Sequence, residues 1–381
     1  MGKKRIEELD IIKALAIICM VLGHSGFWGT GFVFLFHMAV FFIASGCTYS
    51  SRSSDSIGNV IDFIRKKIVR LWFPFFFWRT LWTLLNNWFI RVNILTDNPE
   101  LLEYTKSMKI MNLNSQPPAV HMMSVREMLV NIVNSAFFRG FSKVGGALWF
   151  LGTLFFVSVS FCIADYLIKK IFRRDPLFFQ VVISVILLGF SYYCHITGFG
   201  LDALARLSCS YYLFFLGTVL MRFRNRFAQI GRGKMLAAFA VSFVILIIMD
   251  AMGHHKIQIT IGSNFYPNPL FFAAASVCGW VFLYSISYFL KNTPLKKPLT
   301  VIGSCTMGIL ALHYLSFKIV CAIVVKVYGL PSFCIAARPH LYGDTGLWWL
   351  AYTVVGVTVP VLLNMLYRRV KKKLTASTDR N

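Results

Sequence analysis

Charged residues are scarce in this 381-residue chain, and acidic residues are the scarcest of them. Only 14% of the residues are charged, against about 25% in an ordinary soluble domain. The chain has 15 Asp and Glu against 39 Lys and Arg, and few of the acids fall in apolar runs. So few acidic residues at membrane depth support neither a glycosidase carboxylate pair nor an acidic metal site. A mean hydropathy of +0.65 instead predicts a polytopic membrane protein.

The sequence also lacks the familiar local signatures of soluble enzymes. No P-loop, G-x-S-x-G, H-E-x-x-H or dinucleotide-binding fingerprint is present. The nine Cys residues show no C-x-x-C spacing and most lie within apolar runs, so they read as small hydrophobic residues. We therefore predict neither a disulfide framework nor a metal site.

Long apolar runs are what the chain has in quantity. Several of them reach about 17–22 residues, the length that crosses a bilayer as a helix. Hydropathy predicts ten spans, at residues 11–28, 31–48, 71–90, 147–168, 177–195, 207–222, 235–252, 268–290, 300–327 and 346–367. The predicted fold class is all-α, a polytopic transmembrane helical bundle of about ten spans.

The basic residues are distributed as membrane topology requires. A net charge of +24 suggests nucleic-acid binding at first, but 26 of the 39 Lys and Arg fall in short clusters between apolar runs. These clusters precede the first span, follow every even span and end the chain, at Lys3–Arg5, Arg52–Arg70, Lys169–Arg174, Arg222–Lys234, Lys291–Lys297 and Arg368–Arg380. Basic loops mark the cytoplasmic side, so both termini are predicted to be cytoplasmic and no nucleic-acid partner is expected.

The largest loop is predicted on the outer side, at about residues 91–146. It contains a polar stretch at Asn112–Pro118 and an expected amphipathic helix around Val125–Phe138. Long loops outside the membrane are often functional, although a structural cap over the bundle is an equal alternative. No strong internal repeat is present, so residues 1–381 are predicted to form one domain.

Lys13 and His24 are the most informative pair in the sequence, because ionisable groups are costly at membrane depth and are usually functional there. Both fall within the first predicted helix, Ile11–Phe27. Eleven helical residues turn through about 1100°, so the two side chains share a face, and they are about 16 Å apart along the axis. Lys13 has a simpler alternative, in which its ammonium snorkels to the cytoplasmic interface.

His37 is predicted at a depth similar to that of His24. Only Gly26–Gly31 joins the first two spans, so these spans must form a tight antiparallel hairpin. Histidine titrates near neutrality and is the commonest general acid or base. Either histidine alone has an ordinary structural alternative, but two at matching depth favour a catalytic role.

Other polar residues lie at predicted membrane surfaces or within spans. Lys67 and Arg70 open the third span on the cytoplasmic side, where they serve either as positive-inside anchors or as a phosphate-binding patch. Trp149 begins the fourth span, a usual place for an interfacial aromatic ring. His313 lies near the middle of the ninth span, where an interfacial role explains it less well.

In their order and spacing, these residues resemble a known family. The segment from Arg5 to His24, with a basic residue, ten others and then histidine, resembles the opening of the acyltransferase 3 family of integral-membrane acyltransferases. Phe36-His37-Met38 and the residues up to Gly46 resemble its second helix, and Lys67-Ile-Val-Arg70 is similar to its Arg-x-x-Arg motif. Trp149-Phe-Leu, Tyr211–Leu220 and Leu312-His313 also look like family landmarks.

The resemblance implies transfer of an acyl group, usually acetyl from acetyl-CoA, to a carbohydrate hydroxyl. On this basis we expect His24 to act as the general base or as a transient acyl carrier, with His37 orienting the acceptor or His24. Lys13, Lys67 and Arg70 would hold the phosphates of acyl-CoA, and Trp149 and His313 would contact substrate. Lysine at position 13 lacks the bidentate fork of the arginine that is common in the family.

The expected protein is thus a multi-pass O-acetyltransferase of the cell inner (plasma) membrane, with acyl-CoA, a cell-surface polysaccharide or its lipid-linked precursor, and membrane lipid as partners. The alternative is a proton-coupled transporter or polysaccharide exporter, which would use the same intramembrane histidines and lysine. The paired helix breaks typical of transporters are not evident.

Overall fold

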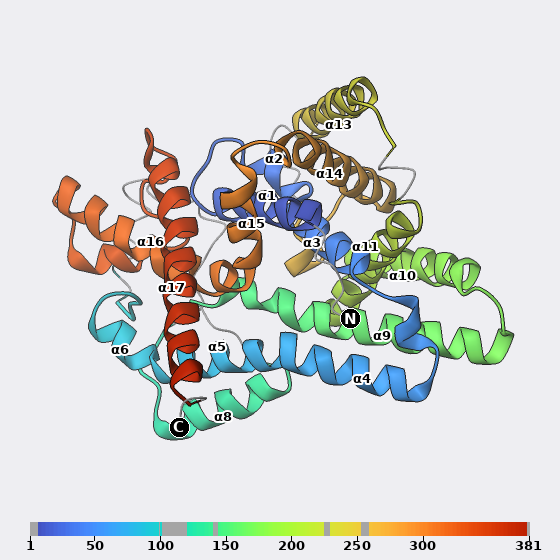
Figure 1. Ribbon diagram of the computed structural model, residues 1–381. Coiled ribbons are helices and arrows are strands. Elements are labelled where there is room, and N and C mark those ends of the chain that lie inside the picture. Colours follow the sequence, from blue (N-terminus) through green and yellow to red (C-terminus); the bar gives the residue numbers. More distant parts are fainter. Residues whose placement is uncertain are drawn as a thin grey trace. The chain divides into compact units, whose positions relative to one another are not determined.

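The architecture is helical throughout the part of the chain that the structure describes (Figure 1). The computed structural model describes residues 7–98, 100, 120–139, 144–224, 229–252 and 259–378, with side chains described to residue 373. Within these ranges the one β-type contact is an isolated bridge between Thr260 and Phe265. The predicted all-α class is confirmed.

Eight stretches of helix are long and apolar enough to cross a membrane, counted over the described residues. They match eight of the ten predicted spans. They are α2 and α3 together (Thr30–Phe34 and His37–Cys47), η3 with α9 (Gly146–Leu148 and Trp149–Phe172), α10 (Leu177–Thr197), α11 (Asp202–Arg222), α13 (Arg232–Met252), α14 (Pro269–Leu290), α16 (Thr306–Tyr328) and α17 (Trp348–Thr378). The fold is therefore a polytopic helical bundle.

The helix of the first predicted span lies earlier in the sequence than expected. Helix α1 covers Glu7–Gly23, 17 residues, and a turn follows at residues 24–26. His24 is therefore just outside the helix, and the expected helix Ile11–Phe27 is wrong at both ends. The acidic residues at the start of α1 suit the positive end of the helix dipole, and closely spaced glycines end it.

The third predicted span, 71–90, is interrupted. Helix α4 (Ile57–Lys67) continues through a π-helical turn, η2 (Ile68–Trp72), into α5 (Phe73–Leu84), and α6 (Asn86–Arg91) follows. Pro74 explains the widened turn, because it has no N–H for the carbonyl four residues earlier and its ring crowds that carbonyl. The Lys67–Arg70 motif thus lies where α4 gives way to the π-helical turn.

The chain divides into two compact units. Unit 1 comprises residues 1–16, 31–75 and 148–297, and unit 2 comprises residues 17–30, 76–147 and 298–381. Each unit gathers segments that are far apart in the sequence. The prediction of one acyltransferase domain over 1–381 stays a prediction.

Helix α11 occupies the interior of unit 1, where it packs against α3, α9 and α10, while α13 pairs with α14 (Figure 1). Two glycines let α3 and α11 touch through their backbones. A Cβ on Gly46 would lie 2.0 Å from the Phe214 carbonyl oxygen, and one on Gly217 would lie 2.0 Å from that of Ile43. Small residues at helix interfaces are typical of membrane bundles, where close backbone packing drives helix association.

Unit 2 is built around the pair α16 and α17, with the short 3₁₀ helix η5 (Ser332–Ala336) against α16. Helix α8 (Val125–Ala136) confirms the amphipathic helix expected in the large loop. A capping box between Ser124 and Glu127 fixes its start. Of that loop, the polar stretch Asn112–Pro118 lies outside the described residues.

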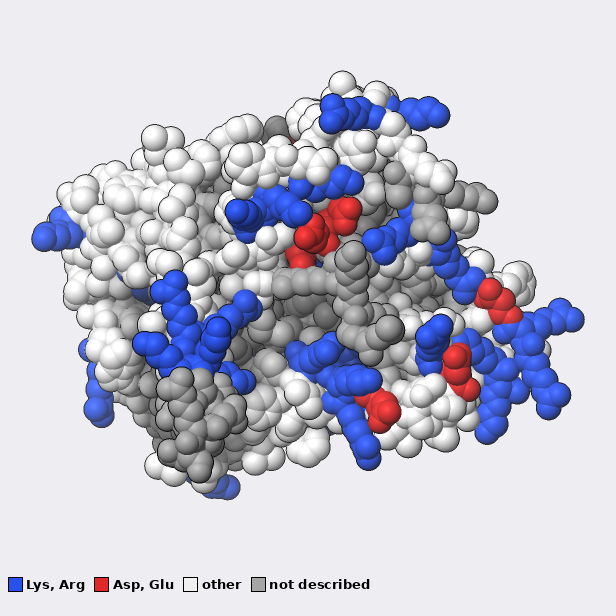
Figure 2. Space-filling view, in the orientation of Figure 1, with Lys and Arg blue, Asp and Glu red and all other residues white. Residues whose placement is uncertain are grey.

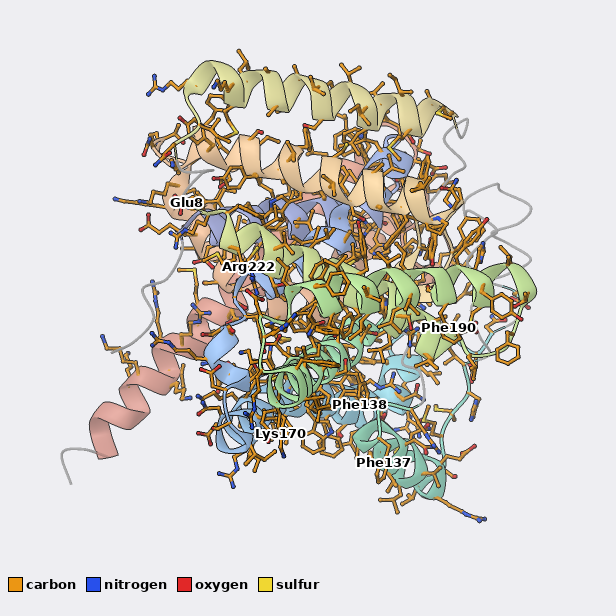
Figure 3. The ribbon with its side chains drawn as sticks, turned by 90° about the vertical axis from the view of Figure 1, so that its right-hand side faces the viewer. Glu8, Phe137, Phe138, Lys170, Phe190 and Arg222 are labelled. Atoms are coloured by element: carbon orange, nitrogen blue, oxygen red, sulfur yellow. The ribbon has the colours of Figure 1, made fainter. Side chains whose placement is uncertain are left out.

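The two ends of the helices in unit 1 differ in charge. Figure 3 shows the labelled Glu8 and Arg222 toward one side of the unit and Phe190 toward the opposite side. Figure 2 shows Lys and Arg side chains well in excess of Asp and Glu on the face that it presents. The end of unit 1 that carries Arg222 and Lys170 is the one that charge distribution in the sequence predicts to be cytoplasmic.

Candidate functional site

His24 lies in a glycine-rich turn that ends α1. Gly26 has a φ of +87°, and a Cβ there would lie 2.4 Å from the backbone of Gly343, so only glycine fits. The Ser25 hydroxyl donates to the Leu22 carbonyl at 2.8 Å and tightens the turn. The turn leaves His24 half-buried.

In unit 2 the ring of His24 lies against two residues of α16. Its centroid is 5.8 Å from that of His313, with the planes stacked at 23°, and 5.2 Å from that of Tyr314. His313 and Tyr314 are themselves 4.1 Å apart. The structure therefore joins His24 and His313, which are almost 290 positions apart in the sequence.

His313 is fully buried, and its two ring nitrogens have different surroundings. Nδ1 lies 3.0 Å from the Ile309 carbonyl oxygen and 3.1 Å from that of Leu310. Carbonyls only accept, so Nδ1 carries the hydrogen and donates. Nε2 therefore carries a lone pair and no hydrogen, and among the described residues it has no hydrogen-bond partner. Buried polar atoms are rarely left in this state, and an unpaired imidazole nitrogen beside a second histidine suits proton transfer.

Two cationic side chains complete this part of unit 2. Lys318, one helical turn after Tyr314, donates to the carbonyls of Ile335 at 3.1 Å and Ala337 at 2.7 Å. These bonds fix the segment that leads into Arg338, whose guanidinium lies 4.8 Å from the centre of the Tyr314 ring. Lys318 thus holds the outer segment so that Arg338 reaches the aromatic ring beside His24.

A second turn supports the turn at His24. The backbone N–H of Gly343 donates to Nδ1 of His340 at 3.0 Å, so this nitrogen must be unprotonated. A Cβ on Gly343 would lie 2.2 Å from the Ser25 carbonyl oxygen, so the two turns touch. Burial lowers the pKa of His340 to about 4, and the nearby Asp344 carboxylate only partly opposes this effect.

Unit 1 holds a separate cluster of cations. Lys67 ends α4, Arg70 lies in the π-helical turn and Lys13 comes from α1. Burial lowers the pKa of Lys67 to about 8, and the positive charges of Arg70 and Lys13 add to the effect. The Lys67 ammonium also lies 5.1 Å from the centre of the Phe63 ring. The three predicted phosphate-binding residues are thus electrostatic neighbours.

A buried carboxylate anchors the segment that leads into α4. Asp165 of α9 accepts hydrogen bonds from Tyr49 at 3.0 Å and Ser54 at 2.5 Å. It also lies 3.5 Å from the ammonium of Lys169, which in turn contacts Asp55 at 3.0 Å. Because α4 packs along α9, this network fixes the helix that ends in Lys67.

Trp149 lies at the start of α9 in unit 1, beside an arginine. The guanidinium of Arg206 is 5.6 Å from the centre of the Trp149 ring and donates to the Gly262 carbonyl at 2.7 Å. Its Nε is buried, and no described residue provides it with a hydrogen-bond partner. A Cβ on Gly262 would lie 3.1 Å from the Trp149 ring, so the indole packs closely on this backbone.

Comparison with known proteins identifies the family. The model of the Acyl_transf_3 family, described as an acyltransferase domain, matches residues 6–365. The chain belongs to the acyltransferase 3 family. No curated protein and no solved structure matches the chain significantly. The eight long apolar helices accord with a membrane acyltransferase.

The structure of this acyltransferase brings some of the predicted site residues together. His24 and His313 meet in unit 2, and Lys13, Lys67 and Arg70 are neighbours in unit 1. His37 and Trp149 also belong to unit 1. Nδ1 of His37 donates to the Val33 carbonyl at 2.8 Å, and its ring contacts that of Phe34 at a centroid distance of 4.9 Å.

The sequence prediction missed the neighbours of the acyltransferase's histidine pair. Lys318 gave the clearest signal, because it is an ionisable residue inside a predicted apolar span. Its spacing from Tyr314 also places both on one face of α16. Arg338 gave no usable signal, since it lies in a loop whose path depends on tertiary contacts. Asp165 also gave a signal, because it is a single acid within the apolar run of α9, and the structure shows that its side chain is buried.

Proposed function

We propose that this acyltransferase moves an acetyl group from acetyl-CoA to a hydroxyl of a carbohydrate at the inner (plasma) membrane. The acceptor would be a cell-surface polysaccharide or its lipid-linked precursor. Membership of the acyltransferase 3 family supports the reaction class. The contact between His24 and His313, whose Nε2 is buried and unpaired among the described residues, carries the proposal that the chemistry takes place at His24.

The donor binds through the cation cluster of unit 1. The phosphates of acetyl-CoA carry several negative charges, and Lys67, Arg70 and Lys13 are grouped to meet them. Arginine offers a bidentate fork for phosphate, and lysine offers a point charge. This end of unit 1 is the predicted cytoplasmic end, where acetyl-CoA is available.

The transfer step uses His24 as a general base. Its imidazole takes the proton of the acceptor hydroxyl while the hydroxyl oxygen attacks the thioester carbonyl carbon. The carbon–sulfur bond breaks, and the leaving thiolate receives the proton and departs as CoA. In the carrier version a ring nitrogen of His24 attacks the thioester carbon and the carbon–sulfur bond breaks, so that CoA leaves as the thiolate. The acceptor hydroxyl then attacks the acetyl-imidazole and the carbon–nitrogen bond breaks. The hydroxyl proton passes by way of His313 to the thiolate, which departs as CoA, and His24 is regenerated. In both versions the lone pair on His313 Nε2 supports the proton movements of its neighbour.

The acceptor binds through aromatic and hydrogen-bonding side chains. Trp149 offers a broad apolar ring to a sugar face, and Arg206 beside it offers donors for hydroxyl or acidic groups. His37 serves to orient the acceptor or His24. Arg338, held at Tyr314, adds positive charge near the histidine pair, where negative charge develops on the thioester oxygen during the reaction.

The direct test mixes purified full-length protein with acetyl-CoA and a polysaccharide acceptor, and follows free thiol and acetylated product together. The proposal predicts acceptor-dependent thiol release with equal formation of an ester. The transporter alternative makes the opposite prediction. No acceptor would cause thiol release from acetyl-CoA, and proteoliposomes would take up glycan in a proton-coupled manner.

A further inference from the structure

A cleft in unit 1 opens where α1 begins and where α11 and α14 end. Its volume is about 110 Å³. The lining includes Glu8 and Ile12 of α1 and three aromatic residues of α14, Trp280, Tyr284 and Tyr288, with Arg224 and Lys291 beyond the ends of their helices. All the lining residues belong to unit 1. We call it the α1–α14 cleft.

The aromatic wall follows from helical spacing. Residues 280, 284 and 288 are four apart, so they line one face of α14. Planar rings on one face suit the stacking of a flat heterocycle, and such stacking accepts any base. The cleft is well below the roughly 300–1,000 Å³ of a complete ligand pocket, so it has room for one ring system and not for a whole CoA molecule.

Charged groups surround this aromatic wall. The Lys291 ammonium lies 4.9 Å from the centre of the Tyr288 ring and 3.5 Å from the Glu8 carboxylate. Glu8 and Arg224 both act electrostatically on the Tyr284 hydroxyl. Glu8 and Lys291 are each about one-third exposed, and ion pairs of this kind stabilise little, so Lys291 can exchange Glu8 for another anion at low cost.

The cleft leads toward the cation cluster. Cys47 lines the cleft, and the Lys13 ammonium is close enough to interact electrostatically with its thiol. Lys13 is in turn a neighbour of Lys67. In Figure 3 the labelled Glu8 lies on the same side of unit 1 as Arg222, the predicted cytoplasmic side. Through Cys47 and Lys13, the cleft is therefore an electrostatic neighbour of the cation cluster that includes Lys67 and Arg70.

We propose that the α1–α14 cleft binds the adenine and 3′-phosphate end of the acyl-CoA donor. Trp280, Tyr284 and Tyr288 take the adenine ring, and Glu8 accepts a hydrogen bond from its amino group. Arg224 and Lys291 contact the 3′-phosphate, while the pyrophosphate lies at the cation cluster. This assignment rests on the proposed function and specifies how its donor is recognised.

The 3′-phosphate gives a direct test, because dephospho-CoA lacks only that group. Binding of CoA and of dephospho-CoA to the purified full-length protein is measured by titration calorimetry. The wild type should bind CoA about tenfold more tightly, as expected for a charge-assisted contact. The double variant Arg224→Gln/Lys291→Gln should lose this preference, and its KM for acetyl-CoA should rise about tenfold with kcat within twofold.

Lys296→Gln is the matched control. It removes a lysine of the same segment, one that pairs with Glu7 and does not line the cleft, so the preference for CoA should remain. Equal binding of CoA and dephospho-CoA by the wild type would overturn the proposal. The proposal would also be overturned if the double variant kept the preference for CoA over dephospho-CoA. If that variant instead lost bound phosphatidylglycerol, the cleft would be assigned to a lipid phosphate. Absence of acetyl transfer by the wild type would refute the proposed function and with it this assignment.

Discussion

Lys67 should make donor binding depend on pH in a defined window. Its ammonium is partly buried and close to Arg70 and Lys13, which together hold its pKa near 8. With that pKa about 90% of Lys67 is charged at pH 7 and about 10% at pH 9. If only the charged form binds the donor phosphate, the KM for acetyl-CoA rises about tenfold between pH 7 and pH 9.

The direction of this effect distinguishes it from unfolding. The pKa of Lys67 in the folded protein lies below its ordinary value of 10.5, so the unfolded chain binds the extra proton between about pH 8 and 10.5. Lys67 therefore contributes increasing stability as the pH rises through that window. Donor affinity falls over the same range because the charge is lost. The expected pattern is therefore weaker donor binding at high pH, while the contribution of Lys67 to the stability of the fold rises.

The assay measures acetyl-CoA KM and kcat from pH 6.5 to pH 9.5 for the wild type and for Lys67→Arg. Arginine stays charged throughout, so the variant should show a KM that changes less than twofold. A thermal melt at each pH confirms folding. A flat KM in the wild type, or the same rise in Lys67→Arg, would refute the assignment of Lys67 to the donor phosphate.

Two further predictions concern the histidines of unit 2. His313→Gln should lower kcat for acetyl transfer by at least about a hundredfold, the usual contribution of a proton-transfer group, with acetyl-CoA KM within twofold. An unchanged kcat would show that Nε2 of His313 takes no part in the transfer. His340 is neutral in the fold with a pKa near 4. Burial of neutral His340 should stabilise the fold fully above about pH 6.5. As the pH falls toward 4, the free energy of unfolding should drop by roughly 3 kcal/mol. His340→Asn should flatten that dependence in urea titrations, and an unaltered slope would show that burial of His340 is not its cause.

The helical architecture was largely predictable because a bilayer imposes length and apolarity on each span. Errors arose where local backbone chemistry overrides hydropathy. The apolar run around α1 continues past Gly23, but the glycines and the contact of Gly26 with Gly343 end the helix there. The third predicted span reads as one apolar run, whereas Pro74 converts its start into a π-helical turn.

The site was predictable residue by residue but not as an assembly. His24 and His313 were each identified as costly polar groups, yet their contact depends on how α16 packs against the turn after α1. Arg338 acquires its role from Lys318, which fixes the preceding backbone through two carbonyls. One sequence contains no signal for such contacts, because they join segments that only tertiary packing brings together.

The proposed mechanism depends above all on His24 as the residue that performs the acyl transfer. The measurement is acceptor-dependent acetyl transfer and thiol release by purified His24→Ala, beside the wild type and the control His121→Ala. His121 is an exposed histidine paired with Glu127, so its loss should leave the rate unchanged. We expect a fall of at least about a hundredfold for His24→Ala with unchanged acetyl-CoA binding. Acetyl transfer by His24→Ala at the wild-type rate would show that His24 is not the residue that performs the transfer.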